Sequence, residues 1–352
     1  MTDRADLWSR LVAANLVAGP MPETAAEASP WYVTAMIGIA AWVASLFFLV
    51  FVGIALAEVF RYDEGWLPVG LVLCAACAVA FRIGRRSMFV TQLALSMSLA
   101  GQALIAYGVL RHQTSNPAAW IALAVIAIVL VAAAPHSVHR VLAALAAALC
   151  TRYALAFAGL SPMFPALVAA AFLLALFGEE RGLATRALWH AVATGLALGA
   201  LVVIPAQLGE IFWWGMGTHR PPPAAMSWAG AFALAVVFLA AIARALHRAR
   251  LPWSSRTSVV ALAAGAALAL AARPVAGLTL ALIILLAAFD AGRRALAGLA
   301  IAGMLFALGH YYHSMDTTLL AKSAALFASG VVLLAAGLAV RLGIAGEEAD
   351  HA

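Results

Sequence analysis

The sequence predicts an all-helical protein, a polytopic bundle that crosses a membrane about twelve times. Of the 352 residues, 66% are hydrophobic and only 10% are charged, and the mean hydropathy is +1.01. A soluble protein of this length needs a larger share of charged residues to cover its surface. Since a spanning helix needs about 20 apolar residues, the apolar content suffices for about twelve spans with short connections.

Residues 1–30 form a polar leader, which we expect in the cytoplasm, ahead of the first long apolar run. Its apolar residues recur at helical spacing, at Leu7, Trp8, Leu11, Val12 and Leu16. This spacing predicts an amphipathic helix at the membrane interface or packed against the bundle. The apolar run that follows has no small-residue cleavage site, so we do not interpret the leader as a cleaved signal peptide.

Residues 31–342 form the predicted transmembrane bundle, and residues 343–352 form a short polar cytoplasmic tail. Apolar runs between charged residues, prolines and glycines predict its helices. The runs cover residues 35–57, 67–81, 88–110, 118–134, 141–158, 163–177, 191–208, 227–243, 258–272, 274–290, 295–312 and 318–340. Around Arg273, the sequence leaves open whether two helices or one broken hairpin form.

The arginines provide an independent test of this count. Fifteen lie on the side of the leader, at Arg4, Arg10, Arg82, Arg85, Arg86, Arg140, Arg181, Arg186, Arg244, Arg248, Arg250, Arg256, Arg293, Arg294 and Arg341. Four lie on the opposite side, at Arg61, Arg111, Arg220 and Arg273. Since basic residues accumulate in cytoplasmic loops, this asymmetry predicts that both termini are cytoplasmic.

Several classes of protein are excluded. Lys322, the only lysine, follows no glycine, so the chain lacks a phosphate-binding P-loop and is not an ATP-driven motor by itself. The arginines lie singly or in pairs between apolar runs rather than on one basic face, so we expect no nucleic-acid partner. Cys74, Cys77 and Cys150 lie in apolar runs, where cysteine behaves as a small buried hydrophobic residue. We expect no metal and no cofactor.

Arg152 interrupts an apolar run at about the depth of the bilayer centre. Insertion scales assign an arginine there a cost of about 2.5 kcal/mol or more. We therefore expect its side chain to face the bundle interior, where it either recognises or gates an anion or forms a structural pair. Snorkelling toward the outer headgroups is a third alternative.

Polar side chains follow two neighbouring stripes of the helix expected at 88–110, with Thr91, Ser98 and Gln102 on one and Gln92 and Ser96 on the other. Two glutamines inside a membrane helix need hydrogen-bond partners, which are either other helices or a solute. Gly101 and Gly108 should let another helix approach closely in either case.

A third polar cluster lies at the outer ends of the last two predicted spans. It contains His310, Tyr311, Tyr312, His313, Asp316 and Lys322. His310, His313 and Asp316 recur every third residue, a geometry that suits a proton or solute site at the outer mouth and, as a weaker alternative, a metal site. Tyrosine and histidine at a helix end are also ordinary interfacial residues.

Other charged and histidine residues fall on the cytoplasmic side. Glu179 and Glu180 beside Arg181, and Asp290 beside Arg293 and Arg294, predict local charge pairs. His136 and His139 also lie on the cytoplasmic side. Because these two histidines lie on the membrane face opposite His310 and His313, we expect that the two pairs do not build one site.

Three segments carry a likeness to a known family. The first segment has Pro30, Trp31 and Tyr32 followed by Ala41 and Trp42. The second has the stretches 92–95 and 98–102, and the third has Tyr311 and Tyr312 followed by Leu319, Leu320, Lys322 and Ser323. The chain thereby resembles the bacterial membrane-protein family called domain of unknown function 4401. The resemblance implies an integral protein of the bacterial inner membrane and no particular activity. The chain has Gly309 and His310 where we expect a more aromatic run, so the resemblance implies no role for His310.

We interpret the chain as a secondary transporter or permease-like protein for a small solute, with anions as one candidate class. In this interpretation Arg152 recognises charge, Gln102 hydrogen-bonds the solute, and His313 or Asp316 handles protons. The alternative is a non-transporting membrane partner or sensor subunit that binds sibling membrane proteins. We do not expect an enzyme, because no nucleophile–base pair, metal site or carboxylate pair can be placed on one membrane face.

Overall fold

The computed structural model of the chain describes residues 4–14, 65–83, 88–182, 185–206, 223–273 and 275–314, with single residues at 19, between 32 and 54, and between 320 and 338. Within these residues the chain is helical and has no β-strand. The helices are α1 (Arg4–Ala13), α4 (Trp66–Ile83), α5 (Met88–Leu110), α6 (Pro117–Ala133), α7 (Ser137–Phe157), α8 (Phe164–Arg181), α9 (Arg186–Ala206), α10 (Ala224–Arg248), α11 (Arg256–Ala271), α12 (Ala276–Asp290) and α13 (Arg294–Ser314). A short 3-10 helix, η1 (Ser161–Met163), joins α7 to α8.

The helices α4 to α13 follow the predicted apolar runs one for one, from 67–81 to 295–312. Among the described residues, six helices are long and apolar enough to cross a membrane: α4, α5, α7, α8 with η1, α10 and α13. The shorter α6, α11 and α12 are also apolar. The runs at 35–57 and 318–340 lie mostly outside the described residues, so the count of twelve spans stays a prediction.

The break at Arg273 separates two helices rather than the arms of one hairpin. α11 ends at Ala271 and α12 begins at Ala276, and both helices pack against α10. Arg273 itself lies over the ring of Trp228 on α10, with 3.9 Å between the guanidinium carbon and the ring centroid. This cation–π contact fixes the turn against the start of α10.

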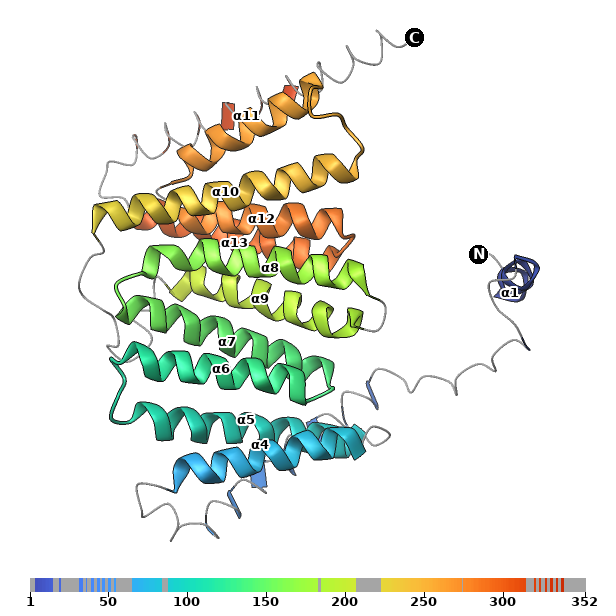
Figure 1. The fold of residues 1–352 in the computed structure, drawn as a ribbon, viewed down its shortest axis with the longest axis vertical. Coiled ribbons are helices and arrows are strands. Elements are labelled where there is room, and N and C mark those ends of the chain that lie inside the picture. Colours follow the sequence, from blue (N-terminus) through green and yellow to red (C-terminus); the bar gives the residue numbers. More distant parts are fainter. Residues whose placement is uncertain are drawn as a thin grey trace.

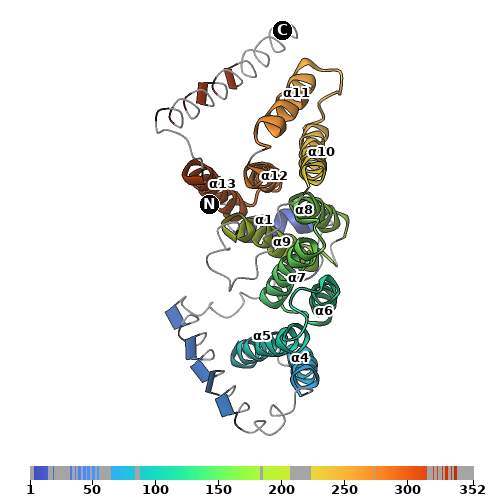
Figure 2. The same cartoon turned by 90° about the vertical axis from the view of Figure 1, so that its left-hand side faces the viewer.

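The helices α4 to α13 lie side by side in an elongated row (Figure 1). Consecutive helices pair as α4 with α5, α6 with α7, α8 with α9, and α12 with α13. The pairs join mainly where α7 packs on α9 and where α10 packs on α8 and α12. Figure 2 shows the same row from the side, with α11 at the end opposite α4. This order arises because short connections make successive helices neighbours in space.

Glycines set the close approach of α4 and α5, which confirms the prediction for Gly101 and Gly108. A Cβ atom on Gly101 would lie 2.8 Å from Cys74 Sγ and 3.0 Å from the carbonyl oxygen of Gly70. A Cβ atom on Gly108 would lie 3.1 Å from the backbone nitrogen of Leu67. Small residues at such crossings are typical of membrane helices, which associate by close packing.

The centre of the row is a tight apolar core formed by α8, α9, α10 and α12. Phe172, Ile283 and Ile284 are each 0% exposed. The outer faces of the helices are also apolar, because Ile83 is 81% and Phe232 is 73% exposed. Large apolar side chains on the outside of a helical row are expected where lipid is the solvent.

Candidate functional site

A buried polar pair lies between the hairpin α4–α5 and helix α7. Ser98 Oγ on α5 is 2.8 Å from His139 Nε2 on α7, and the two residues are 1% and 0% exposed. The ring of Phe81 on α4 packs beside the His139 ring, with 5.3 Å between the ring centroids. Ser98 was predicted to lie on a polar stripe, and the structure shows the partner of its side chain.

The sequence did not predict His139 as that partner, because the apolar run placed the start of the helix at residue 141. α7 begins earlier, at Ser137, since the Nδ1 atom of His136 accepts a hydrogen bond from the backbone N–H of His139 (3.4 Å). This bond satisfies one of the free N–H groups at the helix start. Residues 137–140 therefore belong to the helix, and His139 lies buried inside the bundle.

Two polar atoms of this site, one on His139 and one on the neighbouring Gln102, have no hydrogen-bond partner within the described part of the chain. They are His139 Nδ1 and Gln102 Nε2, and both are buried. Gln102 follows Ser98 by four residues, so the two side chains lie on the same face of α5. A buried polar group left unpaired costs about 1–3 kcal/mol. The site therefore carries hydrogen-bonding capacity that a bound solute or water can satisfy.

Two further hydrogen bonds of the polar stripes lie within α5 and between α4 and the backbone of α5. The hydroxyl of Ser96 donates to the backbone carbonyl of Gln92 one turn earlier (3.0 Å), and the thiol of Cys74 donates to the carbonyl of Ser98 (3.7 Å). Cys74 and Cys77 are 4% and 2% exposed, which confirms the prediction that both are buried hydrophobic residues. The Cys74 thiol thus tethers α4 to α5 at the level of the Ser98–His139 pair.

Two arginines hold the end of α6 beside this site. Arg82 Nη2 on α4 donates to the carbonyl of Ala133 (3.3 Å), and Arg140 Nε on α7 donates to the carbonyl of Val131 (3.2 Å). The last carbonyls of a helix lack partners inside the helix and carry partial negative charge, so a guanidinium is a favourable cap. These bonds join α4, α6 and α7 at one end of the row.

Arg152 lies away from the Ser98–His139 pair. It follows His139 by thirteen residues, about 20 Å along α7. Arg152 lies in the last two turns of α7, which ends at Phe157, and the membrane depth predicted for it stays a prediction. Its neighbour Tyr153 stacks on Trp120 in the first turn of α6, with 4.6 Å between the ring centroids. Arg152 is half-buried at the far end of the hairpin α6–α7.

The predicted outer cluster is described only in part. His310, Tyr311 and Tyr312 are half-buried and His313 is exposed at the end of α13, where the rings of Tyr312 and His313 meet edge to face at 5.7 Å. Asp316 and Lys322 lie outside the described residues. Among the residues that are described, no group of three histidine, cysteine, aspartate or glutamate side chains could hold a metal ion.

A network of charged side chains joins four helices at the end where α8 stops. Glu179 on α8 binds Arg293 between α12 and α13, and its Oε1 atom is 3.1 Å from His190 Nδ1 and 3.9 Å from Arg186 Nε on α9. Arg293 and Glu179 are 10% and 13% exposed in their side chains. Burial lowers the pKa of Arg293 from its usual value, and the Glu179 carboxylate opposes this shift.

The neighbouring carboxylates bind α10. Arg248 Nη1 lies 3.0 Å from Glu180 Oε1 and 2.8 Å from Asp290 Oδ2 at the end of α12. Arg244 also binds Glu180, and its guanidinium carbon lies 4.4 Å from the centroid of the Phe177 ring. The prediction of local charge pairs is therefore wrong. Adjacent residues on a helix point in different directions, and Arg293 and Arg294 lie after the end of α12, so these carboxylates meet arginines of other elements instead.

One comparison with known proteins identifies the chain. The family described as a domain of unknown function (DUF4401) matches residues 30–342. No curated protein and no solved structure matches the chain.

Proposed function

We propose that this chain, which belongs to the family of that domain of unknown function (DUF4401), is a permease-like membrane protein that binds a small solute between the hairpin α4–α5 and helix α7. The observation that carries the proposal is the buried Ser98–His139 pair with unpaired atoms on His139 and Gln102. Polar groups are costly at membrane depth and are commonly retained there for a solute or ion pathway.

The available atoms indicate what kind of solute the site would accept. Gln102 Nε2 is an amide donor, so it favours a hydrogen-bond acceptor such as a carboxylate, carbonyl or hydroxyl oxygen. His139 Nδ1 donates or accepts according to its tautomer. Arg152 would recognise negative charge at a separate step, about 20 Å further along α7. Small anions and their neutral, oxygen-rich analogues are therefore the proposed substrate class.

The location that we propose is the bacterial inner membrane, with both termini in the cytoplasm. The arginine asymmetry supports this orientation. The network around Glu179 and the caps formed by Arg82 and Arg140 lie at the end of the helices that the arginines assign to the cytoplasm. A reporter fused after residue 352, active only in the cytoplasm, should be active, whereas the same reporter inserted between residues 209 and 222 should not.

A panel of solutes tests the proposed site. The purified protein is heated with monocarboxylates, dicarboxylates, inorganic phosphate, sulfate, neutral sugars and polyols, and the melting temperature is measured. One class should raise it for the wild type and for Gln113→Leu, whose glutamine is exposed in the loop after α5. The same class should have little effect on Gln102→Leu, and proteoliposome uptake of that solute should fall in parallel.

The test also has outcomes that count against the proposal. If no class of solute binds the wild type, or if Gln102→Leu and Gln113→Leu respond alike, the site around Ser98, His139 and Gln102 is not a solute site. Arg152→Gln should weaken binding of anions only. A variant that folds normally and leaves every flux and binding signal unchanged would remove Arg152 from the mechanism.

The alternative function, a membrane partner or sensor subunit, has its own test. Purification of the tagged protein from its native membrane in mild detergent should yield a monomer or homodimer if the chain is a permease. A stoichiometric second protein would favour the subunit, and the unpaired atoms of Gln102 and His139 would then be sought at that interface.

A further inference from the structure

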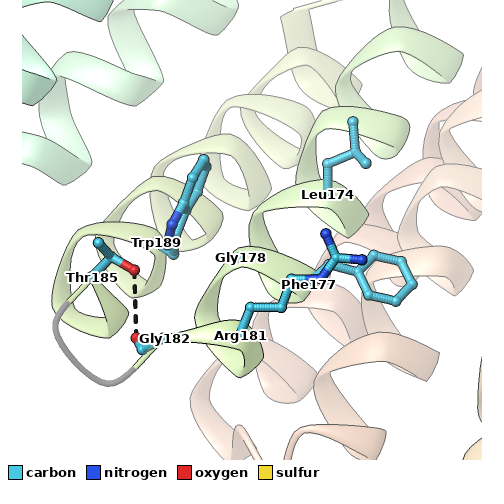
Figure 3. A pocket seen from close by; sticks show the side chains of 7 residues that line it. All are labelled: Leu174, Phe177, Gly178, Arg181, Gly182, Thr185 and Trp189. Atoms are coloured by element: carbon cyan, nitrogen blue, oxygen red, sulfur yellow. Dashed lines mark hydrogen bonds between the residues drawn. The ribbon is translucent and has the colours of Figure 1, made fainter.

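An open pocket lies between α8 and α9, at the ends of these helices where the charged network also lies. Its volume is about 590 Å³, and it is lined by Leu174, Phe177, Gly178, Arg181, Gly182, Thr185 and Trp189. In Figure 3, Leu174, Phe177 and Arg181 come from α8, Thr185 and Trp189 come from the start of α9, and the Arg181 side chain extends toward the Phe177 ring. None of these residues belongs to the Ser98–His139 site.

The pocket changes from polar to apolar along α8. Arg181 and Thr185 lie on opposite sides of the rim, and the Thr185 hydroxyl donates a hydrogen bond to the carbonyl of Gly182 (3.4 Å). Leu174 lies seven residues before Arg181, about 10 Å deeper along the helix. Leu174 is 66% exposed and Phe177 is 39% exposed, so the deeper wall is an open apolar surface.

A glycine gives the pocket its shape. A Cβ atom on Gly178 would lie 2.5 Å from the Trp189 ring, so the indole packs directly on the backbone of α8. The ring then forms one wall beside the rim. Tryptophan is enriched where the apolar interior of a membrane meets the headgroups, which matches the level at which the apolar wall gives way to Arg181 and Thr185.

The charges around the pocket leave one cation available at the rim. Glu179 and Glu180 each bind arginines of the network, and Arg244 lies against Phe177 behind the wall. Within the described ranges, Arg181 takes part in no ion pair, and its side chain lines the pocket. The carboxylates nearest to Arg181 are thus already neutralised, and Arg181 contributes positive charge to a pocket that is open to lipid.

From this geometry we infer that the pocket binds an anionic phospholipid. The phosphate lies at the Arg181 guanidinium, and an acyl chain follows Phe177 and Leu174 into the membrane. Basic pockets between membrane helices on the cytoplasmic side bind anionic headgroups, and a surface arginine attracts an anionic lipid through its charge. A free phosphate satisfies Arg181 but leaves the apolar wall uncovered, so the gradient along α8 favours a lipid. The inference does not depend on the solute site.

Native mass spectrometry of the full-length protein tests this inference. The detergent-purified chain is titrated with dioleoyl phosphatidylglycerol, with dioleoyl phosphatidylcholine and with glycerol 3-phosphate. Phosphatidylglycerol should bind at least about fivefold more tightly than phosphatidylcholine, and Arg181→Gln should reduce its binding by about fivefold, the contribution of one arginine near the membrane surface. Arg181→Lys should retain most of the binding.

Arg294→Gln is the matched control, because Arg294 is exposed at the start of α13, beside the same charged network, and lies outside the pocket. Its phosphatidylglycerol binding should equal that of the wild type. Equal binding of the two lipids, or equal losses in Arg181→Gln and Arg294→Gln, would overturn the inference. So would glycerol 3-phosphate that competes as strongly as the lipid, since the apolar wall would then contribute nothing. Gly178→Ala offers a second variant, which should weaken lipid binding by displacing the Trp189 ring.

Discussion

The guanidinium of Arg293 binds the carboxylate of Glu179, 114 positions earlier in the chain. Both side chains are nearly buried, at 10% and 13% exposure. This pair ties the turn between α12 and α13 to the end of α8, and His190 and Arg186 extend it to α9. It therefore connects helices that are far apart in the sequence.

Removing one partner of this pair should destabilise the protein strongly. Arg293→Gln leaves Glu179 without its closest cation in a nearly buried position, and the expected loss is about 3 kcal/mol in the free energy of unfolding. Arg10→Gln, which breaks the exposed Arg10–Asp6 pair, should cost less than about 1 kcal/mol. Denaturant unfolding in detergent micelles measures both. If Glu179→Gln combined with Arg293→Gln loses the full sum of the single losses, the two residues do not interact.

Packing of α4 against α5 predicts opposite effects for two glycine-to-alanine changes. A Cβ atom on Gly70 would lie 2.7 Å from the carbonyl oxygen of Gly101, so Gly70→Ala should force the helices apart and cost about 1–3 kcal/mol. Nothing lies within 4 Å of a Cβ atom on Gly298 in α13. There the alanine should stabilise the helix by about 0.5–1 kcal/mol. Thermal unfolding compares the two variants, and an equal melting temperature would contradict the packing seen here.

The start of α7 should weaken in acid. Burial lowers the pKa of His136 from its usual value of 6.5, so the folded state favours the neutral ring that caps the helix. The unfolded chain then binds more protons, and stability increases with pH across this range. The contribution of His136 is complete above pH 6.5 and is lost as the pH falls through the lowered pKa.

Thermal unfolding of the wild type and of His136→Asn, measured at pH 7.5 and at pH 5.5, checks this prediction. Asparagine is a good helix cap that does not titrate, so the variant should lose less stability on acidification than the wild type. The groups that face His136 are the stacked ring of Phe81, which does not titrate, and His139, which is present in both proteins. Equal losses in the two proteins would assign the pH dependence to other residues.

Local sequence patterns predicted the positions of the helices well. The runs at 88–110 and 295–312 agree closely with α5 and α13, because the cost of exposing backbone polar groups to lipid makes every long apolar run a helix. The boundary at residue 141 was wrong, since α7 depends on a histidine cap and not on apolar content alone. Gly101 was correctly predicted as a close-packing position, because the absence of a side chain is itself a local property.

The candidate site was predictable only in part. Ser98 and Gln102 share a helical face by their spacing alone, and both belong to the site. His139 was expected only as a cytoplasmic residue ahead of the run at 141–158. Its pairing with Ser98 was not predicted, because no local pattern relates positions 41 residues apart. Arg181, Thr185 and Trp189 carried no signal as a group, since their pocket exists only where α8 and α9 meet.

By itself, the sequence determined that this protein is a helical membrane protein, because hydropathy and helical period are properties of single segments. The tertiary structure decided which polar groups meet. Arginine pairs with a carboxylate more than a hundred residues away, and serine meets a histidine of another hairpin, because the direction of each side chain depends on how the helices turn and pack against one another.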